Sequence, residues 1–366
     1  MITRIVWLLL LGLSLGFAQD NARTVADLVA DGNMNLTRGD CQFAQYFFQE
    51  ALKAEPENTE ATLGKGRALV CQGAYDLGIT ELLRVSETEP NNIAARVQLA
   101  DAYKQQYDSD RARFAAKLDD ALAVIQNAER IEPDNAELLN IKGVVLFLQG
   151  TRSGDMEALE GAREALEGTI ASYDSMSIQD QALVQINLGK TYLELGEREL
   201  ALGAFKRAVS LNPASASAHN NVGATYIALG NCDDGIYELT QAVNLNPGSV
   251  SATFNLGRAK FDCDQVEASL PHFEAALELP DSLSIPQLYT YASRAYVLLG
   301  RFDEAVRRAQ QGALLPPTSA EALYYLGQGY EARNAEGDSQ RARDAYESAL
   351  EIDPDYSLAQ EALANL

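Results

Sequence analysis

Small and apolar residues recur at helical spacing along everything after residue 24. In one clear stretch, Leu188 and Gly189 are followed by Tyr192, and Ala201 is followed by Phe205. Separations of three and four residues place side chains on one face of a helix. The pattern predicts an all-α fold made of short amphipathic helices.

The same arrangement returns when the sequence is shifted by 34 residues. Leu188, Gly189, Tyr192 and Phe205 become Val222, Gly223, Tyr226 and Leu239. A small residue at one position of each predicted first helix lets a second helix approach closely, and the large residue on that helix fills the space. Nine units carry this small residue: Gly32, Gly66, Ala100, Gly143, Gly189, Gly223, Gly257, Ser293 and Gly327.

These motifs resemble the tetratricopeptide repeat (TPR), whose signature is an L-G-x-x-Y element, an A-x-x-x-F element and then a proline, here Pro213, at a period of 34. The resemblance implies a right-handed superhelical solenoid of helix-turn-helix repeats, with the first helices lining a concave surface. About nine repeats are expected over residues 25–354, followed by a capping helix over 355–366. We expect one continuous domain, since no linker rich in Gly, Ser or Pro interrupts it.

Two units are longer than the period. Surplus residues fall near 106–114 and near 151–157, where Gly150, Gly154 and Asp155 predict a lengthened turn. Such insertions project from one edge of a solenoid and can carry specific contacts. A tolerated surface loop is the alternative.

The N-terminus has the pattern of a secretory signal peptide. Arg4 precedes an apolar stretch that ends in Gly16-Phe17-Ala18, which predicts a signal over residues 1–18 and a short segment over 19–24. The alternative, a membrane anchor, would need about 20 apolar residues. We therefore expect an exported protein, periplasmic or secreted, most simply in a bacterial envelope, with no integral membrane span after cleavage.

Four cysteines fall at matching places in separate units. Cys41 and Cys232 each lie nine residues after the small residue of their own unit, while Cys71 and Cys263 lie five and six residues after theirs. Adjacent units stack at these places, so in an exported protein we predict Cys41–Cys71 and Cys232–Cys263 disulfides. The alternative is four free thiols buried as small hydrophobic residues.

Charge and composition narrow the function. The chain of 366 residues has 29 Lys+Arg against 52 Asp+Glu, a formal net charge of −23. Such a surface repels nucleic-acid phosphates, so no nucleic-acid partner is expected. Only two histidines are present, His219 and His272, and neither lies in a recognised nucleophile or metal motif. We expect no enzyme activity, no cofactor and no metal site.

The predicted concave surface has a distinctive composition in its later units. Its rows give an aromatic and aliphatic strip with three cations in a strongly acidic protein: Ile186, Lys190, Ile227, Phe254, Arg258, Phe261, Arg294 and Tyr324. Aromatic residues and arginine commonly anchor binding partners. The strip predicts a groove for a peptide or protein partner whose carboxylates face it. The alternative is that the rings pack between adjacent first helices and the cations pair with nearby carboxylates.

The sequence thus favours a non-catalytic protein-protein interaction scaffold. A structural scaffold for an envelope polysaccharide or a secretion complex is the alternative, which aromatic rows without cations would favour. An enzyme with an unrecognised site is a further alternative. The oligomeric state and the partner's identity are not fixed by any motif.

Overall fold

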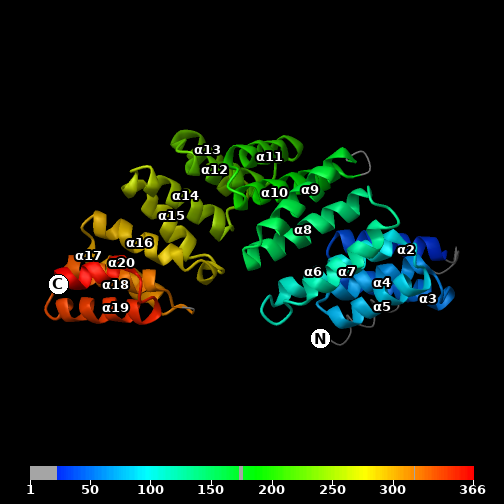
Figure 1. Cartoon of the computed structure of the whole chain (residues 1–366), viewed down its shortest axis with the longest axis horizontal. Coiled ribbons are helices and arrows are strands. Elements are labelled where there is room, and N and C mark those ends of the chain that lie inside the picture. The colour runs from blue at the N-terminus through cyan, green and yellow to red at the C-terminus, as the bar shows by residue number, and fades with distance from the viewer. Residues whose placement is uncertain (1–22, 173–175, 317) are drawn as a thin grey trace, which may run out of the picture. The chain divides into compact units, whose positions relative to one another are not determined.

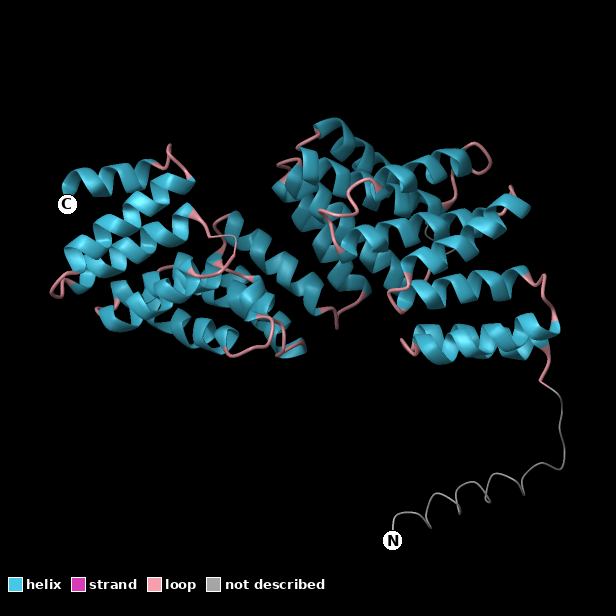
Figure 2. Ribbon diagram, turned by 90° about the horizontal axis from the view of Figure 1, so that it is seen from below, coloured by secondary structure: helices cyan, strands magenta, loops and turns pink. Residues whose placement is uncertain are grey.

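The computed structural model describes residues 23–172, 176–316 and 318–366. The signal peptide expected over 1–18 lies outside the described residues. The described chain contains 19 α-helices and no strand, as the sequence predicted (Figures 1 and 2). It divides into two compact units, Met1–Ser175 and Met176–Leu366, and each is described by itself. One uninterrupted domain stays a prediction.

The first unit contains four helix pairs. In each pair the two helices pack on one another, and each second helix also contacts the first helix of the next pair. The pairs are α2 (Val25–Thr37) with α3 (Cys41–Ala54), α4 (Thr59–Cys71) with α5 (Tyr75–Thr88), α6 (Ile93–Ser109) with α7 (Lys117–Glu129), and α8 (Ala136–Ser153) with α9 (Met156–Ala171).

The second unit contains five pairs and a final helix. A short 3₁₀ turn, η2 (Ser282–Ser284), precedes the fourth of these pairs. The pairs are α10 (Ile178–Glu194) with α11 (Arg198–Leu211), α12 (Ala216–Ala228) with α13 (Cys232–Leu245), α14 (Val250–Asp262) with α15 (Val266–Leu277), α16 (Gln287–Leu298) with α17 (Phe302–Ala313), and α18 (Ala320–Arg333) with α19 (Asp338–Ile352), and they are followed by α20 (Ser357–Asn365).

A proline and a polar cap set where most first helices begin. Pro56 follows the end of α3, and two residues later the side chain of Asn58 accepts a hydrogen bond from the Ala61 amide. Proline lacks an amide donor and ends helices, while an Asn or Ser side chain satisfies an unpaired amide at the next helix start. Asn92, Asn135, Ser215, Ser249 and Ser319 cap their helices in the same way.

The turn inside a repeat needs one residue with a positive φ. Gly230 adopts φ 82° after α12, and its amide donates to the Ile227 carbonyl. Glycine pays no steric penalty in this conformation. Asp264 takes the corresponding place after α14 with φ 60°, a conformation that aspartate tolerates better than most side chains.

The glycine column of the repeat allows the close approach of the paired helices. A methyl group added at Gly189 of α10 would lie 2.5 Å from the Phe205 ring of α11, and Phe205 is fully buried. Gly327 stands in the same relation to the buried ring of Tyr346. These contacts confirm the physical reason inferred for the small and large columns of the repeat.

The surplus residues lengthen helices as well as turns. The extra residues near 106–114 extend α6 to Ser109 and form the turn that precedes Lys117. The prediction of a lengthened turn at 151–157 is wrong, because α8 continues to Ser153 and α9 begins at Met156. Gly154 ends α8 in the left-handed conformation and Asp155 caps α9, so the two residues that suggested a long loop make a short one.

Candidate functional site

A pocket of about 310 Å³ lies on the first-helix face of the second unit. Its lining comes from three successive first helices, α14, α16 and α18, which contact one another in order. Phe261, Arg294 and Tyr324, three of the predicted groove residues, line it together with Val297, Tyr325 and Gln328 among others. The structure therefore brings these three predicted residues to one place.

Arg294 is the central cation of this pocket. Its guanidinium carbon lies 5.0 Å from the ring centroids of Phe261, Tyr291 and Tyr325. These rings belong to three successive first helices, α14, α16 and α18. Arg294 forms no salt bridge with any residue that the structure describes, although its charge acts on the Asp262 carboxylate. Stacked rings hold a guanidinium in position while its N–H edge can still meet a carboxylate.

The predicted aromatic strip is not an exposed surface. Ile186, Phe254, Phe261 and Tyr324 are all buried, with at most 9% of each residue accessible. Of the two interpretations left open by the sequence, packing of the rings within the helix stack is the one that their burial supports. Each first helix must cover both its own second helix and the next first helix, so its large side chains fill the seams between repeats.

Tyr291 joins these buried rings to the pocket. Its centroid lies 5.7 Å from that of Phe254, 5.5 Å from that of Phe261 and 6.1 Å from that of Phe273. Tyr291 and Tyr325 were not among the predicted groove residues, although Tyr325 directly follows Tyr324, which was. For Tyr325, this position one residue further along the helix was the available signal.

The remaining predicted residues are spread over the unit. Ile227 is partly buried against Leu239 and Leu256, so it belongs to the packing core. Ile186 and Lys190 lie one turn apart on α10 and do not line the pocket. Lys190 reaches solvent, but the surrounding protein desolvates its ammonium and lowers its pKa.

Arg258 and Asp262 extend the charged part of this face along α14. Desolvation raises the pKa of Asp262, and the charges of Arg258 and Arg294 oppose that rise. Among the described residues, neither Arg258 nor Arg294 has a carboxylate oxygen within 4.0 Å, so the expected pairing of the cations with local carboxylates is present only as a longer-range attraction to Asp262. The face keeps two guanidinium groups close to one carboxylate.

A second pocket, of about 380 Å³, lies on the first-helix face of the first unit. Leu36, Arg67, Val70, Cys71 and Asp101 are among its lining residues, with Gln98 and Gln105 at one side. The Gln98 side-chain oxygen is buried with no hydrogen-bond partner among the described residues. None of Leu36, Arg67, Val70 and Asp101 is aromatic, so the search for an aromatic strip did not single out this pocket.

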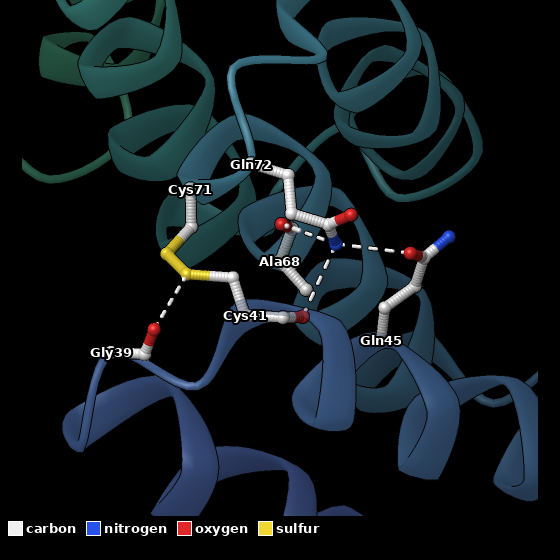
Figure 3. The surroundings of a disulfide bond; sticks show 6 residues. All are labelled: Gly39, Cys41, Gln45, Ala68, Cys71 and Gln72. Carbon is white, nitrogen blue, oxygen red and sulfur yellow. Dashed lines mark hydrogen bonds between the residues drawn. A yellow bond between two sulfur atoms is a disulfide. The ribbon is translucent and has the colours of Figure 1, made fainter.

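The structure joins the cysteines in the predicted pairs. The Cα atoms of Cys41 and Cys71 are 5.8 Å apart, and those of Cys232 and Cys263 are 6.0 Å apart. Both distances suit a disulfide. Around the first pair, the Gln72 side-chain nitrogen lies 3.2 Å from the Cys41 carbonyl oxygen and 3.0 Å from the Gln45 side-chain oxygen (Figure 3).

Both histidines have structural partners. His219 Nδ1 lies 2.6 Å from a Glu238 carboxylate oxygen, and His272 Nε2 lies 2.8 Å from the Lys260 ammonium. Among the described residues, no group of three or more metal-ligating side chains is present, and no helix is both long and apolar enough to span a membrane.

Comparison with known families agrees with this architecture. A family model described as tetratricopeptide repeat matches residues 36–92 and 292–357, and a second model described as TPR repeat matches residues 189–230. The matches lie in both units and include α18 and part of α16, two of the three helices that form the pocket around Arg294.

Solved structures of similar fold cover different shares of the chain. A structure titled functional characterization of Pseudomonas aeruginosa pilF is 17% identical, with a TM-score of 0.51 over 66% of this chain and 97% of that one. A monomeric mutant of IFIT1 with Gppp-AAAA is 19% identical, with a TM-score of 0.54 over 91% and 82%. YrrB, titled a TPR protein with an unusual peptide-binding site, is 22% identical, with a TM-score of 0.43 over 55% and 98%.

At these identities the structural likeness shows the fold alone. The fold, the repeated glycine and ring columns and the matched family models agree with one another. The chain contains tetratricopeptide repeats in both units and has an all-α solenoid fold.

Proposed function

We propose that this chain is a protein-interaction scaffold whose second unit binds a carboxylate-bearing segment of a protein partner at the pocket around Arg294. The TPR family is generally non-catalytic and serves protein or peptide binding, which supports the class of function. The observation that carries the site is the guanidinium of Arg294, which lies over three rings without a salt-bridge partner among the described residues.

The local charge around Arg294, rather than the net charge of the chain, supports an acidic partner. The whole chain carries a formal charge of −23, so an acidic partner gains nothing from the average field. At the pocket, however, Arg294 and Arg258 outnumber Asp262, and a carboxylate can accept two parallel hydrogen bonds from one guanidinium. The partner is therefore expected to meet this face through an acidic side chain or a terminal carboxylate.

Packing supports the position of the contact. The rings under Arg294 are fixed in the seams between α14, α16 and α18, so binding does not have to order them. A pre-positioned arginine backed by aromatic side chains is the usual composition of an interface residue that contributes most of the affinity. Phe261 and Tyr325 line the pocket beside the guanidinium, together with Gln328, whose side-chain nitrogen donates to the Tyr324 hydroxyl.

The test compares two charge reversals in the same unit. Random peptides displayed on phage are selected on the full chain, and synthetic copies of the enriched peptides are titrated against Arg294→Glu and Arg207→Glu. Arg207 is exposed on the second helix α11, so its reversal changes the net charge equally at a place away from the pocket.

The expected result is enrichment of acidic peptides whose affinity falls about tenfold or more in Arg294→Glu and stays unchanged in Arg207→Glu. Equal losses in both variants would assign the effect to net charge and contradict the site. Selection of peptides without acidic groups, or binding of neutral glycans on an array in their place, would contradict the proposed partner chemistry. Export and a periplasmic location remain part of the proposal, and fractionation of the native host tests them.

A further inference from the structure

The two disulfides occupy equivalent places in the two units. Cys41 is the first residue of α3 and Cys71 the last residue of α4, while Cys232 is the first residue of α13 and Cys263 directly follows α14. Each bond therefore joins the start of one second helix to the end of the next first helix. Any difference in their reactivity comes from their surroundings.

The two disulfides differ in the solvent exposure of one cysteine, Cys71. Cys71 is exposed and lines the 380 Å³ pocket of the first unit, whereas Cys41, Cys232 and Cys263 are all half-buried. A thiol that attacks a disulfide must reach one sulfur along the line of the bond, so access decides which bond opens first. Cys71 is the accessible position, and the pocket beside it has room for a small thiol compound.

The helix ends give the first disulfide a chemical direction. A thiolate on Cys41 would lie at the N-terminus of α3, where the helix dipole stabilises negative charge, while a thiolate on Cys71 would lie at the C-terminus of α4. The better-stabilised thiolate is the better leaving group. Attack on Cys71 with departure of Cys41 is thus favoured by both access and charge.

The neighbouring side chains suit an anionic thiol. Arg67 precedes Cys71 by one turn of α4, lines the same pocket, and forms no salt bridge with a described residue. Asp101 lies in the same lining, but its carboxylate accepts a hydrogen bond from Gln105 at 2.7 Å. The exposed cation beside the exposed cysteine favours a compound that carries a carboxylate.

The helix seam has contacts that do not depend on the sulfur-sulfur bond. The Gln72 side-chain nitrogen donates across this seam to oxygens of Cys41 and Gln45, and within its own helix to the Ala68 carbonyl oxygen (Figure 3). Cys41 Sγ lies 3.2 Å from the Gly39 carbonyl oxygen, which can accept a hydrogen bond from the thiol once the bond is broken. The Gln72 contacts with Cys41 and Gln45 still join α3 to α4 when the disulfide is reduced.

We propose that Cys71 is a modification site for a low-molecular-weight thiol that carries a carboxylate. The thiolate of that compound attacks Cys71 Sγ, a mixed disulfide forms on Cys71, and the bond to Cys41 breaks. Cys41 leaves as a thiolate and takes one proton from water. A second molecule of the thiol then reduces the mixed disulfide and leaves as its own disulfide, so the electrons balance.

Reduced glutathione serves as the probe for this step. The full chain is oxidised with diamide, mixed with limiting glutathione, quenched with iodoacetamide at successive times, and mapped by mass spectrometry of its peptides. We expect glutathione on Cys71 and the alkyl group on Cys41, at a rate about tenfold faster than any opening of Cys232–Cys263. Unchanged helicity by circular dichroism shows that the reaction took place on the folded chain.

Three outcomes would overturn the proposal: glutathione attached to Cys41, equal rates at the two disulfides, or failure of Cys41 and Cys71 to join on oxidation. The Arg67→Gln variant supplies the second measurement. It should slow the reaction with glutathione severalfold and leave the reaction with uncharged 2-mercaptoethanol unchanged, because only glutathione carries the carboxylates that Arg67 attracts. Equal slowing with both thiols would refute the role of Arg67.

Discussion

Arg333 donates two hydrogen bonds to Asp338, from Nη2 at 2.7 Å and from Nε at 2.8 Å, and the Asp338 side chain has no exposure to solvent. Arg341 and the Ala335 amide donate to the same carboxylate. These four donors lower the pKa of Asp338, with the Arg333 hydrogen bonds as the largest cause. The turn between α18 and α19 is therefore held by one buried charge.

Acid should weaken the second unit through this carboxylate. Because the pKa of Asp338 is lower in the folded chain than the value of about 3.9 in an unfolded one, its stabilising contribution is complete above pH 4 and is lost as the pH falls below it. In Asp338→Asn the melting temperature should fall by several degrees at pH 7 and depend less on pH between 5 and 3. Thermal melts across this range measure both effects.

Asp303→Asn is the matched control for that prediction. Asp303 also contacts Arg333, at 3.4 Å, but 79% of its side chain is exposed. Exposed ion pairs contribute little, so this variant should melt like the parent chain at every pH. A loss in Asp303→Asn equal to that in Asp338→Asn would contradict the assignment to the buried carboxylate.

Two glycines in one repeat should respond oppositely to alanine. Gly189→Ala places a methyl group 2.5 Å from the buried Phe205 ring and should cost about 1–3 kcal/mol of unfolding free energy. Gly203, inside α11, has open space where the methyl group would go, so Gly203→Ala should stabilise by about 0.5–1 kcal/mol through helix propensity. Urea titration of both variants measures these changes in unfolding free energy. An unchanged unfolding free energy for Gly189→Ala would show that the helix pair can separate without cost.

Mildly acidic pH should loosen the α14–α15 pair. Burial, followed by the charge of Lys260, lowers the pKa of His272 below its ordinary value of 6.5. The unfolded chain then binds the proton more readily, so stability is complete above pH 6.5 and falls as the pH drops through that value. Hydrogen exchange of α15 amides should accelerate from pH 7 to pH 5, after correction for intrinsic rates, in the parent chain and not in His272→Gln. The same acceleration in the variant would exclude His272 as its cause.

The disulfides should be present and stabilising in the isolated protein. The intact unreduced chain should weigh four hydrogens less than the reduced chain, with Cys41 linked to Cys71 and Cys232 linked to Cys263. Each bond closes a loop of 30 or 31 residues, for which chain entropy predicts about 3.5 kcal/mol. A Cys232→Ser/Cys263→Ser double variant should show that loss in urea. Any other linkage in the peptide map would contradict the structure of the seam.

The repeat and its register could be predicted because both depend on residues that are close together in the sequence. Gly189 and Phe205 belong to neighbouring helices only 16 positions apart, and the same pair of columns recurs throughout the chain. The length of α8 could not be predicted in this way. Gly150 and Gly154 suggested a loop, but helix continues past Gly150, where an added methyl group would lie 2.7 Å from Leu159 of α9.

The candidate site was predicted only in part. The helical period placed Phe261, Arg294 and Tyr324 on one face, and they do line one pocket. Their exposure depended on how closely adjacent first helices pack, which no single repeat encodes. Tyr291 of α16 contacts both Phe254 and Phe261 of the preceding first helix, α14, so the protein itself covers rings that the sequence offered to a partner.

The last helix, α20, covers the apolar side of the final repeat. Ala359 is fully buried with Tyr324 and Tyr346, and Leu363 and Leu366 pack against the same cluster. A chain cut before Ser357 would expose this apolar cluster to solvent. Association of such copies through the exposed cluster would be head to tail, an arrangement that need not close into a ring. The nine residues of α20 thus cover an apolar cluster that a shortened chain would present to water or to a second copy.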